Sequence, residues 1–209
     1  MSRKSRKPRC QVCGLHLEGC ICADLPVLDL PTRFVVVQHN RERHKPTSTG
    51  RAAAAILRAP LVYYGAQGET LDTTHFTVEE NEYVVLFPSE DARVASAEAL
   101  APSPGRRRCV VILDGTWHQC SRMARRAAVV SSFPRVSLPP GPPSRWGIRR
   151  PPRPEAVCTL EAAARLVATI HGPDASAPIE RFFAEMTRRM HEQRGSEAPE
   201  DLADEGEEP

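Results

Sequence analysis

The chain has 209 residues, of which 41% are hydrophobic and 26% are charged, close to the average of globular proteins. A chain of this length can bury a core without disulfide support. Its longest apolar runs have the length of a strand, which excludes a membrane span.

The net charge of +2 hides an asymmetry between the body of the chain and its end. Residues 195–209 carry seven acids and no Lys or Arg, so residues 1–194 hold 28 basic against 19 acidic side chains, a net +9. Such a body favours an anionic partner, with nucleic acid as the first candidate. A solvated Arg-rich surface would give the same count.

Composition divides the chain into four parts. Residues 1–9 are predicted to be a flexible basic arm, without the apolar stretch of a secretory signal. Residues 10–25 hold a cysteine cluster, and residues 32–194 are predicted to form the main folded domain. Residues 195–209 are predicted to be an acidic, disordered tail. The odd number of cysteines, seven, favours a reducing compartment, and we expect a cytoplasmic protein.

The cysteine cluster has the spacing of a metal site, with Cys10-x2-Cys13 followed by Cys20-x-Cys22. Four thiolates within thirteen residues can close a tetrahedral zinc site, and His16 could replace one of them. A metal also suits a segment too small to bury a core of its own. A redox dithiol pair and chance clustering are the alternatives. We expect a structural zinc knuckle.

Strand-like and helix-like patterns alternate from residue 32 onward. Apolar and β-branched runs predict strands at 33–39, 61–64, 83–87, 108–113 and 135–138. Helical patterns cover 51–59, 117–130, 159–171 and 179–194, with a weakly helical segment at 91–100. This alternation predicts an α/β fold, layered around a mainly parallel sheet.

Such sheets bind ligands beyond the carboxyl ends of their strands. That rule points to three loops, at residues 39–49, 88–91 and 114–117. A fourth, longer loop at 139–154 holds seven prolines and four arginines around Trp146. Long loops in compact domains tend to be functional.

The turn Asp114-Gly115-Thr116-Trp117 leaves the fourth predicted strand. Asp114 stands where α/β folds place ligands, and Gly115 permits a close backbone approach. Thr116 can cap the next helix, and Trp117 offers a flat face for a base or an adenine. Without context, an ordinary strand-turn-helix with a capping Asp and a core Trp is the better interpretation of these four residues.

This turn resembles the D-x-T-W signature that names the DTW-domain family. Four other segments are similar to that family and occur in the expected order. The first is the CxxC…CxC leader, and the second runs from residues 38–42 through 48–50. The third is 86–89, and the fourth is 149–151 leading to 159–162. The resemblance covers roughly residues 10–190. The chain departs from the family at Asn40, where Pro is frequent, and at Ser48, where Asn is common; both residues can still turn and cap.

The resemblance implies a SPOUT-like fold with a knot-like cofactor site in its C-terminal region, and makes residues 32–194 the DTW catalytic domain. It implies transfer of the 3-amino-3-carboxypropyl group of S-adenosylmethionine to N3 of a tRNA uridine, with release of 5′-methylthioadenosine. Asp114 would serve as general base or would position N3–H, since an ordinary Asp is a weak base for this proton.

The expected site residues fall into three groups. The catalytic group is Asp114, Thr116 and Trp117. The residues expected around S-adenosylmethionine are His39, Glu42, Thr49, Phe87, Pro88, Ser89, Leu113 and Gly115. The residues expected on tRNA are Arg122, Arg125, Arg126, Arg145, Trp146, Arg149 and Arg150, because cations interleaved with an aromatic suit phosphate contact and stacking.

Three other functions compete with this one. A SPOUT-like RNA methyltransferase would use the same cofactor and transfer a different group. A zinc-knuckle protein could bind RNA without catalysis. A thiol redox protein would rest on the CxxC pair alone. Neither the composition nor the motifs predict an oligomeric state.

Overall fold

A six-stranded sheet, parallel throughout, forms the centre of the computed structural model, which describes residues 7–65, 70–199 and 202. The strand order is β2-β1-β5-β3-β6-β4. The predicted basic arm and acidic tail fall largely outside the described residues. The strands are β1 (Arg33–His39), β2 (Leu61–Tyr64), β3 (Asn81–Leu86), β4 (Arg93–Val94), β5 (Arg107–Asp114) and β6 (Arg135–Ser137).

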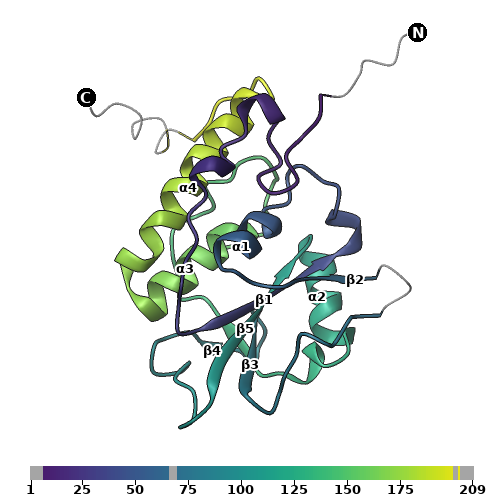
Figure 1. The fold of residues 1–209 in the computed structure, drawn as a ribbon, viewed down its shortest axis with the longest axis vertical. Coiled ribbons are helices and arrows are strands. Elements are labelled where there is room, and N and C mark those ends of the chain that lie inside the picture. Colours follow the sequence, from purple (N-terminus) through teal and green to yellow (C-terminus); the bar gives the residue numbers. More distant parts are fainter. Residues whose placement is uncertain (1–6, 66–69, 200–201, 203–209) are drawn as a thin grey trace.

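Helices cover both faces of this sheet (Figure 1). α2 (Trp117–Arg126) packs on one face, whereas α1 (Gly50–Ile56), α3 (Thr159–His171) and α4 (Pro173–Glu192) build the other layer. Because side chains alternate along a strand, Val35 contributes to the α2 side and Val36 to the opposite core. Burial on both faces explains the unbroken apolar strands. In the described part of the chain, no helix is both long and apolar enough to cross a bilayer.

The layered α/β fold with a parallel sheet is confirmed, and the predicted bounds of β1, β2 and α3 match the structure. The weak helix predicted at 91–100 is wrong, because this segment forms turns around the two-residue edge strand β4. α4 begins at Pro173, six residues before the predicted start, and continues through Pro178. Proline is tolerated in the first turn of a helix, but Pro178 lies beyond it.

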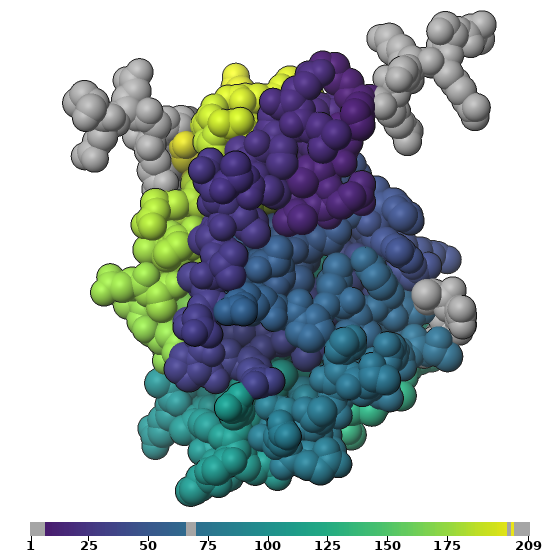
Figure 2. All heavy atoms as spheres, in the orientation of Figure 1, coloured from purple at the N-terminus to yellow at the C-terminus, as the bar shows by residue number. Residues whose placement is uncertain are grey.

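The cysteine segment packs against α4 and the loop before α1 (Figures 1 and 2). The His16 backbone N–H donates to Gln193 Oε1 at 2.9 Å, and Leu15 is fully buried in the main core. Gly14 has a φ of +75°, and a Cβ there would lie 2.1 Å from the Pro46 carbonyl oxygen. Only glycine fits this crossing, so the segment and the loop are held in contact.

Candidate active site

A cavity of about 740 Å³ opens where β3 and β5 end. Its walls come from the loop before α1, the ends of both strands, the start of α2, the proline-rich segment after β6 and the start of α3. The volume lies within the range of roughly 300–1,000 Å³ that small-molecule sites occupy. The position agrees with the rule that parallel sheets bind ligands beyond the carboxyl ends of their strands.

Asp114, at the end of β5, is 3% exposed and accepts hydrogen bonds on both carboxylate oxygens. Oδ2 accepts from Gln38 Nε2 and from Ser48 Oγ, each at 2.7 Å, and Oδ1 accepts from Thr159 Oγ1 at 2.5 Å. The register of β1 on β5 pairs Gln38 with Asp114 directly. A buried carboxylate requires such donors, and here they come from three separate segments of the chain.

Two helices begin beside this carboxylate. A Cβ on Gly50, the first residue of α1, would lie 2.3 Å from Asp114 Cγ, so the helix start is in direct contact with the acid. Thr49 Oγ1 accepts from the Leu160 backbone N–H at 3.1 Å, which links the start of α1 to the start of α3. A negative charge is favourable at a helix N-terminus, because the first N–H groups are unpaired.

Glu161 attaches the proline-rich segment to α3. Its carboxylate is buried and accepts from Ser144 Oγ at 2.5 Å, from the Arg145 N–H at 2.7 Å and from the Cys158 N–H at 3.0 Å. The last of these closes a capping box with Cys158 at the N-cap. The proline-rich segment (residues 139–154), which forms one wall of the cavity, is therefore attached to the start of α3 at Ser144 and Arg145.

Glu42 is fully buried and forms two ion pairs, with Lys45 Nζ at 2.6 Å and with Arg149 Nη2 at 2.8 Å. Burial alone would raise the pKa of this carboxyl, but the two cations outweigh burial and hold the pKa below its usual value. Arg149 Nε also donates to Thr47 Oγ1 at 2.8 Å. Glu42 thus joins the loop before α1 to the proline-rich segment.

The start of α2 supplies another wall. Thr116 caps the helix, with its hydroxyl accepting from the Gln119 N–H at 3.3 Å while Gln119 Oε1 accepts from the Thr116 N–H at 2.7 Å. Trp117 lies next to Phe87, with ring centroids 5.7 Å apart at 43°. Both rings line the cavity and give it an aromatic surface.

The structure brings most of the expected catalytic and cofactor residues to this cavity. Those that line it are Thr49, Phe87, Pro88, Leu113, Asp114, Gly115, Thr116 and Trp117. Three expected cofactor residues are placed elsewhere: Glu42 lies behind the wall in its ion pairs, Ser89 lies just past the lining, and His39 faces a separate, smaller pocket.

The residues expected on RNA are scattered. Trp146 is 3% exposed, packs on Phe183 and borders the larger cavity, so it is not on the outer surface where an RNA base would stack. Arg149 and Arg150 line the cavity, and Arg145 is half-buried with its N–H on Glu161. Three arginines remain exposed on α2: Arg122, Arg125 and Arg126.

Several residues that hold this site were not among those expected from the sequence. Gln38 and Thr159 are donors to Asp114, and Glu161 fixes the proline-rich segment. Gln38 and Glu161 each left a signal, since a polar residue in an apolar strand and a carboxylate on a buried helix face both require partners. Thr159 is the first residue of α3 and lies in the family-like segment 159–162, but its side chain alone gave no sign of a contact with Asp114.

The four clustered cysteines could hold a metal ion, because their sulfur atoms all lie within 4.8 Å of one another. Cys10 and Cys22 sulfurs are 3.7 Å apart, and those of Cys13 and Cys20 are 3.8 Å apart. A tetrahedron with zinc–sulfur bonds of about 2.3 Å has edges of about 3.8 Å. The donor set and its spacing therefore fit zinc.

Comparisons with known proteins agree on one family. The DTW domain model matches residues 7–191. Two relatives, both named tRNA-uridine aminocarboxypropyltransferase 2, are 28% identical in Macaca fascicularis and 27% identical in Mus musculus, over 165 residues. These cover 76% of this chain and 55% of each relative, so the chain spans about half the length of the curated relatives it matches.

A similar fold occurs in a solved structure, that of the SAM-dependent rRNA:acp-transferase Tsr3 from Vulcanisaeta distributa. The TM-score is 0.51 at 13% sequence identity, and the match covers 78% of this chain and 80% of that chain. At this identity the likeness concerns the fold alone.

The contact between Gly50 and Asp114 predicts the effect of one added methyl group. Gly50→Ala should lower the free energy of unfolding by about 1–3 kcal/mol, because the buried carboxylate must move away from its three donors. Gly141→Ala is the matched control, since its Cβ would lie 3.3 Å from the end of the Arg165 side chain and 4.0 Å from the Pro139 carbonyl oxygen. Urea unfolding measures both, and equal midpoints for Gly50→Ala and wild type would contradict this packing.

Proposed function

The chain belongs to the DTW-domain family, and from this membership we propose that it transfers the 3-amino-3-carboxypropyl group of S-adenosylmethionine to N3 of a tRNA uridine. The names of the two mammalian relatives describe this class of transfer. The observation that carries the proposal is the cavity of about 740 Å³, lined by Asp114, Thr116 and Trp117 at the carboxyl edge of a parallel sheet.

The sulfonium of S-adenosylmethionine activates three carbons, and attack on the γ-carbon of the amino-acid portion makes the N3–C bond, breaks the S–C bond and releases 5′-methylthioadenosine and the N3 proton. The protein decides which carbon faces the uridine by orienting the molecule. We assign the adenine of S-adenosylmethionine to the apolar ends of β3 and β5, at Phe87 and Leu113. Its amino-acid carboxylate would pair with Arg150 and Arg165.

Asp114 acts in this proposal as a positioning residue. Both of its oxygens already accept from protein donors, and only 3% of the residue is exposed. Three of its roughly four lone-pair positions are already used, and its burial leaves little access for an N3–H group. Its charge, buried in the cavity wall, complements a sulfonium and holds the three surrounding segments in place.

Trp117 is the residue that we place against the target base. Its ring lines the cavity beside Phe87, on the first turn of α2. Stacking on an aromatic face is a common way to hold an unpaired RNA base, and the N3 edge is accessible only when the uridine is unpaired. The exposed arginines of α2 would then contact the nearby phosphates.

The structural metal is the second part of the proposal, and we assign zinc to Cys10, Cys13, Cys20 and Cys22. Burial, together with the neighbouring thiols, raises the pKa of Cys13 and of Cys22. A divalent cation between the sulfurs would stabilise their ionised form. Because Leu15 is part of the main core, this segment would order the loop before α1 as well as itself.

Nucleoside mass spectrometry of unmodified tRNA incubated with the protein and S-adenosylmethionine tests the transfer. Wild type should yield aminocarboxypropyl-uridine, and Asp114→Asn should lower the rate by about ten- to a hundredfold, because an amide cannot accept all three hydrogen bonds. Asp174→Asn, at an exposed aspartate on α4, is the control and should retain the wild-type rate.

Methylated nucleosides alone would replace this proposal with a methyltransferase. Binding of tRNA with no product and no affinity for S-adenosylmethionine would leave an RNA-binding protein without catalysis. Full activity of Asp114→Asn would show that the buried carboxylate does not organise the site.

Metal analysis tests the zinc assignment. One zinc per chain is expected in wild type, and Cys20→Ser should lose the metal and lower the melting temperature by about 5 °C or more, since the segment contributes to the core. Cys109→Ala, in β5 and away from the cluster, should keep its zinc. A metal-free wild-type protein that melts at the same temperature with and without added zinc would contradict the assignment.

A further inference from the structure

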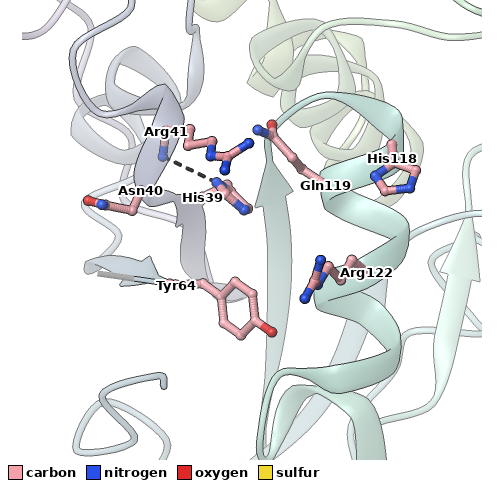
Figure 3. Close-up of a pocket in the computed structure, with 8 residues that line it drawn as sticks. His39, Asn40, Arg41, Tyr64, His118, Gln119 and Arg122 are labelled. Carbon is pink, nitrogen blue, oxygen red and sulfur yellow. Dashed lines mark hydrogen bonds between the residues drawn. The ribbon is translucent and has the colours of Figure 1, made fainter. Parts of the chain in front are cut away.

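A second pocket, of about 350 Å³, lies on the other side of the first turn of α2 (Figure 3). Side chains from the end of β1, the end of β2 and α2 line it: His39, Arg41, Tyr64, His118, Gln119 and Arg122. His118 also lines the larger cavity, so the two hollows are neighbours. The function proposed above uses only Arg122 of this lining, as one of the exposed arginines of α2.

The lining is suited to an anion. It contains two arginines and two histidines, and none of the described residues that line it is Asp or Glu. Glu42, three residues after His39, is fully buried and paired with Lys45 and Arg149. The described lining therefore presents positive charge and hydrogen-bond donors.

Tyr64 provides an independent sign of a ligand. The residue is 1% exposed, and its hydroxyl has no hydrogen-bond partner. A buried hydroxyl without a partner is unfavourable, and each such group in a native structure needs an explanation. The hydroxyl points across the pocket toward α2, on the side where Arg122 lies (Figure 3).

His39 is oriented to donate into the same space. The Arg41 backbone N–H donates to His39 Nδ1 at 3.2 Å, so the neutral ring carries its proton on Nε2. Burial and the positive charges of Arg41 and Arg122 lower the pKa of this ring, and Glu42 only partly offsets them. The ring also meets Tyr64 edge-on, with centroids 6.1 Å apart.

We propose that this pocket binds a backbone phosphate of the RNA substrate next to the target uridine, with Tyr64, His39 and Arg122 as the donors. The proposal rests on the transferase function above. A nucleotide whose base stacks on Trp117 has its sugar and phosphate outside the larger cavity, and His118 borders both hollows. A phosphate in the pocket would satisfy the Tyr64 hydroxyl and fix the position of the strand along α2.

Equilibrium binding of tRNA without S-adenosylmethionine, at several salt concentrations, tests the pocket. Tyr64→Phe removes one hydroxyl and no charge, so affinity should fall about tenfold with an unchanged salt slope. Arg122→Gln should lower the affinity and reduce the magnitude of the slope of log K against log [salt] by about one unit. Tyr63→Phe and Arg181→Gln are the matched controls, because neither residue lines the pocket, and neither should change affinity.

Folding is checked in the same series. Because the Tyr64 hydroxyl has no partner, Tyr64→Phe should melt at or above the wild-type temperature. In steady-state transfer, both pocket variants should raise KM for tRNA about tenfold and leave kcat within about twofold. Wild-type affinity for tRNA in both pocket variants would overturn the proposal.

Two further results separate this inference from the transferase proposal. If wild type makes no aminocarboxypropyl-uridine but the pocket variants still lose tRNA affinity, the transferase proposal fails and the phosphate site stands. If inorganic phosphate protects wild type against thermal unfolding while the pocket variants bind tRNA normally, the pocket is a site for free phosphate and the inference is wrong.

Discussion

A buried carboxylate at the meeting point of two strands and two helices is the constraint on which the rest of this structure depends. Asp114 lies out of water at the end of β5, and an ionised group there requires donors from the protein. Gln38 is in the paired position on β1, while Ser48 and Thr159 come from the segments that lead into α1 and α3. The carboxylate occupies the space where a side chain at position 50 would lie, so only glycine fits there.

The same arrangement recurs twice around the cavity. Glu42 joins the loop before α1 to Arg149, and Glu161 joins the proline-rich segment to α3. Loops normally form the mobile edge of a sheet, yet here the loop before α1 and the proline-rich segment are each held by a buried acid. The walls of such a cavity are ordered before any ligand enters it. Binding a small molecule in one orientation then costs less conformational entropy.

The sequence predicted those features that depend on local patterns. The parallel sheet and the bounds of β2 and α3 follow from apolar runs and breakers, whereas the start of α4 was misplaced because Pro178 within a helix opposes local propensity. In the site, Asp114 was found from its motif. The arginines around Trp146 predicted a base-stacking residue, but the ring is buried. Burial of an aromatic ring in such a loop depends on tertiary packing, which local patterns do not encode. Tyr64 gave no signal, since a tyrosine in a strand is ordinary until its hydroxyl is seen without a partner.

The start of α2 borders both hollows. Asp114 lines the larger cavity from the end of β5, and Trp117 lines it from the start of α2. One residue later His118 borders both hollows, and a further turn of the helix brings Arg122 to the smaller pocket. A helix start that separates a small-molecule cavity from an anion pocket sets the distance between a bound cofactor and a bound phosphate. Under the proposed function, the RNA strand would be positioned by the same helix that forms a wall of the cavity.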